Sequence, residues 1–416
     1  MRIIIAIILL MFGMTSCQSN ISREEIEQII SENESPEAEK KVTKTGVEGI
    51  ISSGYVINDG KYYFLTTKED SDGYNSTTMI AYYDFQNKNG DLICQDPLCN
   101  HDLYGGCKYS CIEEFYFTDI PGVFYAADWS SGNVVLCRID LNNDTVTDVY
   151  DCGTLSAYVF GIDQNILYFY VIERETQDKQ TVKRYHMYAL DIKTEELTDM
   201  GYMPEGIDND FGLPLFVYKG MFYYITVDGD LMIAESDFRY IKKIFECGDD
   251  RFLYWFFDTN TDELYFNVIN KEKRTGTVYV YKDDLVERVD LPHQNIFTFT
   301  LTESEIFYTS YDPIYYGVSR APGNPEVYDY SGGKVYKAER YNTSDAELIY
   351  DCGGEYMICG SVSNFYVFDN KIFFDEKTLI HETIDGIEYT YFSSAHGLKK
   401  VCVDLISGEM LQITLE

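Results

Sequence analysis

Four cysteines and one histidine crowd into one short segment of this 416-residue chain. They are Cys94, Cys99, His101, Cys107 and Cys111, spaced as C-x4-C-x-H-x5-C-x3-C. Thiolate and imidazole groups this close together can surround one Zn²⁺ or another thiophilic metal ion, so zinc is the cofactor that the segment suggests. In an exported protein the same cysteines can instead form two disulfides that staple a long loop. Unpaired thiols are the third interpretation, because the spacing matches no standard zinc-finger pattern closely.

Cys94 also fits a purely structural role. Cysteine recurs at the end of an expected strand, followed by glycine, at Cys152, Cys247 and Cys352. A small buried apolar residue would explain all four positions. Without Cys94 the segment still offers a set of three cysteines and His101 as ligands for one metal ion.

The chain shows no recognised catalytic motif. There is no G-x-S-x-G elbow, no H-E-x-x-H and no glycine-rich phosphate loop. The 69 Asp and Glu residues are too many for sequence to single out a glycosidase-like pair of carboxylates. Of the five histidines, His381 and His396 flank a long expected loop, where a solvated or structural role is commoner than a catalytic one. The sequence therefore favours a binding function over catalysis.

A seven-fold repeat predicts the fold that positions these residues. In each copy a turn signal precedes a short strand that ends on two aromatic residues, and the copies end at Phe64, Tyr125, Phe169, Tyr224, Phe266, Tyr308 and Phe374. The shortest steps between copies are 42 to 44 residues, about the size of one four-stranded blade. We expect an all-β, seven-bladed β-propeller of four-stranded antiparallel blades, although the pattern also allows six or eight blades.

Each aromatic copy is followed by two strands around a polar turn, which is the signature of a hairpin. A blade thus has an entry strand A, an aromatic strand B, and strands C and D. The expected blades span residues 53–96, 112–153, 157–203, 212–248, 252–292, 296–353 and 362–416. Residues 47–52 are a candidate extra strand for the last blade. The recurring aromatics of strand B are expected to pack between blades.

The connections B–C and D–A vary in length, and both open on the same face of a propeller. The long ones cover residues 66–78, 94–111, 173–184, 310–334 and 375–398. Loops on a rigid scaffold commonly carry function, so this face is the expected binding face. Ligand candidates there are aromatics outside the core register and loop histidines: Tyr311, Tyr315, Tyr316, His381 and His396.

The first residues read as an export signal. Residues 3–12 are an apolar run behind Arg2, too short to span a bilayer as a helix, and Met14-Thr15-Ser16-Cys17 resembles a bacterial lipobox. We expect a signal peptide at 1–16, a lipidated Cys17 with an acidic tether at 17–45, and the propeller at 46–416. Two or more acyl chains, palmitate among them, would hold the protein stably on the extracytoplasmic side of the cell membrane.

The net charge of −36 arises from 33 Lys and Arg against 69 Asp and Glu. Nucleic-acid binding is not expected, because its affinity comes from basic residues that neutralise phosphates. So large a charge favours solubility and opposes self-association, which predicts a monomer.

The run CQDPLCNH from Cys94 to His101 resembles the C-x-D-P-x-C-x-H signature of β-propeller lipoproteins from clostridia-like bacteria. The resemblance extends over the lipobox, the acidic tether and the blade pattern, hence nearly the whole chain. It implies an extracytoplasmic, membrane-tethered propeller broadly similar to TolB-like or quinoprotein-like folds. It brings no established activity.

The leading hypothesis is a membrane-anchored lipoprotein whose propeller binds an extracellular protein or glycan without catalysis. The alternative is a carbohydrate-active hydrolase or lyase, or a metal-dependent enzyme, at the cell surface. A structural subunit of a larger envelope assembly is the third hypothesis.

Overall fold

The structure of the chain is a computed structural model. It describes residues 50–52, 56–58, 61–69, 76–84, 87, 89–96, 99, 107–109, 112–118, 120, 122–128, 134–153, 155–177, 180–204, 207, 211–270, 275–293, 295–312, 319–321, 324–327, 331–353, 356–359, 365–368, 370–384, 387–392 and 399–413. Within these ranges, no helix has the length and apolar character needed to cross a bilayer.

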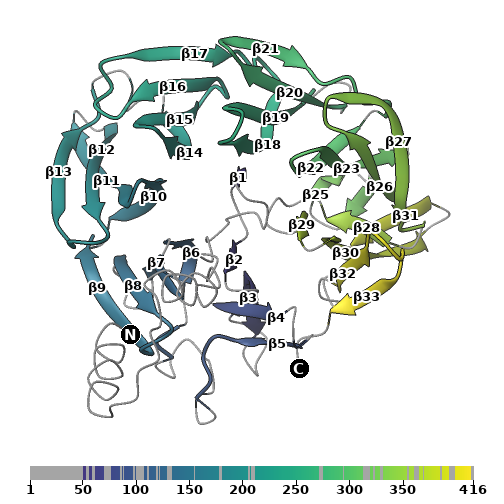
Figure 1. The fold of residues 1–416 in the computed structure, drawn as a ribbon, viewed down its shortest axis with the longest axis horizontal. Coiled ribbons are helices and arrows are strands. Elements are labelled where there is room, and N and C mark those ends of the chain that lie inside the picture. Colours follow the sequence, from purple (N-terminus) through teal and green to yellow (C-terminus); the bar gives the residue numbers. More distant parts are fainter. Residues whose placement is uncertain are drawn as a thin grey trace, which may run out of the picture. The chain divides into compact units, whose positions relative to one another are not determined.

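Seven antiparallel sheets, the blades, form a ring (Figure 1). The first three blades follow one another along the chain from residue 56. Blade one contains β2 (Val56–Asn58), β3 (Lys61–Glu69), β4 (Ser76–Asp84) and β5 (Asn89–Leu92). Blade two contains β6 (Ile112–Phe117), β7 (Val123–Asp128), β8 (Val135–Asp140) and β9 (Thr145–Asp151). Blade three contains β10 (Ser156–Asp163), β11 (Ile166–Gln177), β12 (Gln180–Asp191) and β13 (Leu197–Tyr202).

The other four blades complete the ring. Blade four contains β14 (Phe211–Tyr218), β15 (Met221–Thr226), β16 (Leu231–Glu235) and β17 (Ile241–Phe245). Blade five contains β18 (Arg251–Asp258), β19 (Glu263–Ile269), β20 (Gly276–Lys282) and β21 (Leu285–Arg288). Blade six contains β22 (Ile296–Leu301), β23 (Glu305–Asp312), β26 (Ser331–Glu339) and β27 (Asn342–Asp351). Blade seven contains β28 (Tyr356–Cys359) and β29 (Tyr366–Phe368), which both pair with β30 (Lys371–Ile384), then β32 (Lys399–Asp404) and β33 (Met410–Ile413).

The predicted seven-bladed propeller is confirmed, and the strands of blades one to six lie within one residue of their expected spans. Blade seven begins earlier than expected, with β28 at Tyr356 and not at residue 362. The long connection inside blade six forms the two-stranded hairpin of β24 (Ser319–Ala321) and β25 (Asn324–Val327), and not an eighth blade. In blade seven, β31 (Ile387–Phe392) extends the end of β30 as a second hairpin. Among the described residues, blades one and seven share no strand.

The expectation that residues 47–52 join the last blade is wrong. Strand β1 (Ile50–Ser52) pairs with β18 of blade five, with Ile50 opposite Asp258 and Ser52 opposite Phe256. The innermost strand of a blade leaves one edge of backbone groups without a neighbouring strand, and β1 satisfies part of that edge. Figure 1 shows β1 inside the ring of innermost strands, between blade five and β2 of blade one.

Antiparallel pairing fixes two opposite faces of the ring. The A–B and C–D turns lie at one end of every blade, the turn face, and the B–C and D–A connections lie at the other end, the loop face. An aspartate opens several C–D turns and accepts hydrogen bonds from backbone N–H groups two or three residues on, as Asp140, Asp191 and Asp404 do. These bonds lower the pKa of Asp191 and of Asp404 and explain the acidic turns of the sequence.

The aromatic residues of strand B form the core between blades, as predicted. In β11, Phe169 packs in a cluster with Tyr125 of blade two, while the next residue, Tyr170, packs with Phe222 of blade four. Successive side chains of a strand point to opposite faces of the sheet, and a propeller covers both faces with neighbouring blades. Two consecutive aromatics can therefore both be buried.

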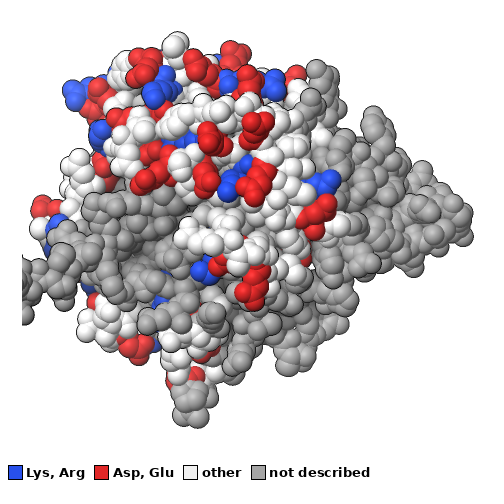
Figure 2. Space-filling model, turned by 45° about the vertical axis from the view of Figure 1, so that its right-hand side comes forward, with Lys and Arg blue, Asp and Glu red and all other residues white. Residues whose placement is uncertain are grey.

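Blades five and six are also joined by a buried ionic cluster at the turn face. The guanidinium of Arg340, between β26 and β27, lies 2.6 Å from Asp258 and 2.8 Å from Glu263 of blade five. Its Nε donates to the hydroxyl of Tyr265 at 3.0 Å. The side chain of Arg340 is fully buried and both carboxylates are nearly so, in contrast to the interspersed acidic and basic side chains on the surface in Figure 2.

Candidate ligand-binding site between blades one and two

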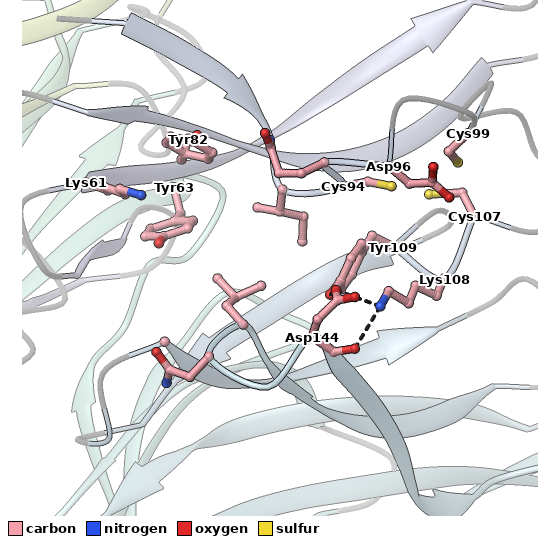
Figure 3. Close-up of a pocket in the computed structure, with 15 residues that line it drawn as sticks. Lys61, Tyr63, Tyr82, Cys94, Asp96, Cys99, Cys107, Lys108, Tyr109 and Asp144 are labelled. Atoms are coloured by element: carbon pink, nitrogen blue, oxygen red, sulfur yellow. Dashed lines mark hydrogen bonds and ion pairs between the residues drawn. The ribbon is translucent and has the colours of Figure 1, made fainter. Parts of the chain in front are cut away.

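A cavity of about 870 Å³ lies where blades one and two meet. Blade one contributes Lys61, Tyr63, Tyr82 and Ile93 to its wall. Blade two contributes residues beside its A–B and C–D turns, namely Gly122, Leu141, Asn142 and Asp144. The rest of the wall comes from the inserted segment between the blades, which supplies Cys94, Gln95, Asp96, Cys99, Cys107, Lys108 and Tyr109 (Figure 3).

The inserted segment reaches this place because β5 is short. After Leu92 the N–H of Ile93 still donates to the carbonyl of Ile80, and the chain then leaves the blade. Further on, the hydroxyl of Tyr109 donates to the Asp144 carboxylate at 2.7 Å, and the ammonium of Lys108 lies 2.6 Å from the same carboxylate. Both bonds anchor the segment to the C–D turn of blade two.

This anchoring corrects the expected position of the segment. Residues 94–111 were expected on the loop face with the other long connections. The described part of the segment instead contacts Asp144 in a C–D turn and lines a cavity with Gly122 beside an A–B turn, both at the turn face. A D–A connection can reach the opposite face because the outer strand ends early and leaves the groove between two blades uncovered.

The wall from blade one is aromatic and basic. The ammonium of Lys61 lies 4.5 Å from the centre of the Tyr82 ring, a cation–π contact, and the rings of Tyr82 and Tyr63 are 6.1 Å apart. Burial, with the charges of Asp91 and Asp84, raises the pKa of Tyr82, so its hydroxyl stays protonated at neutral pH. Tyr63 is buried and Tyr82 is half-buried, which leaves part of the Tyr82 ring for a ligand.

The three described cysteines of the segment come together at the other end of the cavity. The Sγ atoms of Cys94, Cys99 and Cys107 all lie within 4.8 Å of one another. A hydrogen bond from the Cys99 N–H to the Asp96 carbonyl closes the turn that brings Cys99 back towards Cys94. Burial, aided by hydrogen bonds with the other two thiols, raises the pKa of Cys107 to about 12. Among the described residues no disulfide joins these three cysteines.

Cys94 therefore combines the two roles that the sequence suggested separately. Like Cys152, Cys247 and Cys352, it is a buried residue at the end of strand D. Unlike them, it faces two further thiols, so it belongs with the metal-ligand candidates.

The described lining of the cavity does not include the other predicted site residues. Tyr311 in β23 and His381 in β30 are described only as strand backbone. Others lie outside the described residues: Cys17, His101, Cys111, Tyr315, Tyr316 and His396. The sequence analysis did not identify Lys61, Tyr82 and Asp144 as site residues. All three lie in repeated parts of a blade, where aromatic residues are expected in the core and acidic residues in the turns. The position of Lys108 and Tyr109 directly after Cys107 was the sequence feature that could have indicated a site here.

Comparison with solved structures agrees with the fold. The β-propeller domain of the Trilobed protease from Pyrococcus furiosus is 10% identical, with 88% of this chain and 98% of that chain covered and a TM-score of 0.49. The Pyrococcus horikoshii acylaminoacyl peptidase is 10% identical with a TM-score of 0.51, and 89% of this chain covers 53% of that one, about half its length. An oligogalacturonate lyase from Vibrio parahaemolyticus is 10% identical, with 84% and 98% covered and a TM-score of 0.47.

No protein-family model matches the chain, and no curated protein is significantly similar to it. At 10% identity, the structural likeness shows the fold alone. The class that the sheets define is a seven-bladed β-propeller with an inserted segment between its first two blades.

Proposed function

We propose that this chain is a membrane-anchored, extracytoplasmic binding protein, and that the cavity between blades one and two holds a short glycan. The lipobox-like run that ends at Cys17 supports the anchor, with palmitate among its acyl chains, and the acidic composition fits a soluble domain outside the cell.

The cavity is the observation that carries the proposal. Its volume of about 870 Å³ falls in the range of roughly 300–1,000 Å³ typical of small-molecule sites. It combines an aromatic ring at Tyr82 with amide and carboxylate groups at Gln95, Asn142 and Asp96. Sugars present apolar C–H faces that pack on aromatic rings and hydroxyl groups that both donate and accept hydrogen bonds.

The charges in the cavity favour a neutral ligand over a strongly charged peptide. Lys108 and Asp144 already pair with each other, and Lys61 lies over the Tyr82 ring. A hydroxylated, uncharged ligand would use the polar groups of the wall without having to break the Lys108–Asp144 pair.

The same charges favour binding over hydrolysis. The described carboxylates of the wall are Asp96 and Asp144. A general acid in glycoside hydrolysis needs a raised pKa, whereas hydrogen bonds from Lys108 and Tyr109 lower the pKa of Asp144. Asp144 is therefore suited to holding the inserted segment and not to giving up a proton to a leaving group.

The Tyr82→Ala variant tests the proposed glycan site. Wild-type protein is screened on an array of di- to tetrasaccharides from bacterial cell walls and plant polysaccharides, and the best binder is titrated calorimetrically. We expect Tyr82→Ala to weaken binding about tenfold or more, because a lost aromatic stacking surface is worth ~0.5–1.5 kcal/mol beyond the lost buried area.

Two further variants make that experiment decisive. Lys61→Ala removes the cation over the Tyr82 ring and should also weaken binding, while Tyr240→Ala, an exposed tyrosine of blade four, should bind as wild type does. Unfolding temperatures establish that each variant is folded. Equal affinity in wild type, Tyr82→Ala and Lys61→Ala would refute the site, and an array without any hit would refute the glycan.

A further inference from the structure

We propose that Cys94, Cys99 and Cys107 bind one zinc ion as thiolates and thereby tie the inserted segment to both of its neighbouring blades. Two of the three thiols are buried and the third, Cys99, is half-buried. All three line the cavity between blades one and two, and their Sγ atoms converge within 4.8 Å (Figure 3).

The convergence of three thiols at one point favours a metal. A disulfide joins only two sulfur atoms, so a disulfide arrangement does not require the Sγ atoms of Cys94, Cys99 and Cys107 to meet. A zinc ion uses all three, since Zn–S bonds of ~2.3 Å in a tetrahedral site place the sulfur atoms about 3.8 Å apart. The observed limit of 4.8 Å requires only a small contraction of the cluster.

The chemistry of the ligand set selects the metal class. Thiolate ligands favour zinc and other thiophilic metals over the hard cations calcium and magnesium, which prefer oxygen. Binding would convert three thiols to three thiolates and release three protons, so that the ion and its ligands together carry one negative charge.

The position of the cluster gives the ion a mechanical role. Cys94 follows strand D of blade one, and Cys107 is joined directly to Lys108, whose ammonium pairs with Asp144 in blade two. An ion held by Cys94, Cys99 and Cys107 would therefore close the segment onto the groove and fix one wall of the cavity. This metal site stands on the thiol geometry and does not depend on which ligand the cavity binds.

The test measures zinc in the full chain, purified under reducing conditions and equilibrated with zinc chloride before removal of unbound metal. We expect one equivalent of zinc in wild type and less than about a tenth of that in Cys107→Ser. Cys137→Ser is the matched control, because Cys137 is a buried cysteine of β8 outside the cluster, and it should retain one equivalent. Cobalt in place of zinc should give a thiolate-to-cobalt charge-transfer band that Cys107→Ser lacks.

The same experiment can overturn the proposal. Wild type that binds neither zinc nor cobalt would refute the metal site. An intact mass that is lower by two hydrogens for each disulfide, measured on protein purified without reductant, would replace the metal with disulfides. Equal zinc content in wild type and Cys107→Ser would place the ion elsewhere. If Cys107→Ser does not fold, the zinc content of Cys99→Ser, a substitution at the half-buried position, is measured in its place. Glycan affinity is measured on separate variants, so either proposal can fail without the other.

Discussion

The Arg340→Met variant is expected to lose about 3–5 kcal/mol of unfolding free energy, because it strips the cation from two buried carboxylates. Arg340 is held between Asp258 at 2.6 Å and Glu263 at 2.8 Å, with all three side chains nearly or wholly inaccessible to solvent. Burial by itself raises the pKa of Glu263, but the hydrogen bond from Lys282 and the charge of Arg340 bring it below its ordinary value. Glu263 is therefore ionised at neutral pH and needs its partners. Chemical denaturation followed by tyrosine fluorescence measures the loss.

An exposed ion pair between blades four and five provides the control. The ammonium of Lys219 lies 3.1 Å from the carboxylate of Asp262. In the sequence Asp262 falls between Asp258 and Glu263, the partners of Arg340, but both side chains of the Lys219–Asp262 pair are more than half exposed. We expect Lys219→Met to change stability by about 1 kcal/mol at most, as exposed ion pairs do. Equal losses in Arg340→Met and Lys219→Met would contradict a buried clamp between blades five and six.

Replacing Cys17 should abolish lipidation altogether. In a bacterial host that acylates exported lipoproteins, wild-type protein is expected to incorporate an alkyne-labelled palmitate, and Cys17→Ala none, because the acylated thiol is missing. Loss of two acyl chains removes a membrane affinity that grows by ~0.8 kcal/mol for each buried methylene. In-gel detection of the label after click coupling measures the effect.

The neighbouring Ser19→Ala variant keeps the cysteine and is expected to be labelled as wild type is. Label in Cys17→Ala at the wild-type level, or no label in wild type, would contradict an anchor at this residue. Fractionation of the same cells adds a second reading, with wild-type protein expected in the membrane fraction.

The repeat made the blades predictable. Aromatic pairs such as Phe169 and Tyr170 recur because each blade buries both faces of its strand B. The same two-residue pattern therefore appears in the sequence of every blade. Short C–D turns were equally readable, since an opening aspartate such as Asp191 must satisfy the backbone of the turn. These local patterns were therefore sufficient to predict the boundaries of blades one to six, whereas blade seven begins earlier, at β28.

The position of β1 and of the cavity could not be read in this way. Pairing of Ile50 with Asp258 joins residues about two hundred positions apart through backbone groups, which carry no residue-specific signal. The cavity depends on the early end of β5 and on one contact between Tyr109 and Asp144. Neither belongs to the repeat. The cysteine spacing placed Cys94 among the metal-ligand candidates but also allowed a purely structural role for it, and only the structure shows that its Sγ atom meets those of Cys99 and Cys107.

The most direct test of a ligand site between blades one and two is a footprint by hydrogen–deuterium exchange with the tightest-binding array oligosaccharide at saturation. We expect slower amide exchange in peptides that cover residues 93–96, 107–109 and 141–144, the wall of the cavity. Exchange in the remaining blades should stay at its unliganded rate. Protection confined to residues 310–334 or 375–398, with none at the cavity wall, would contradict this account and return the ligand to the long connections.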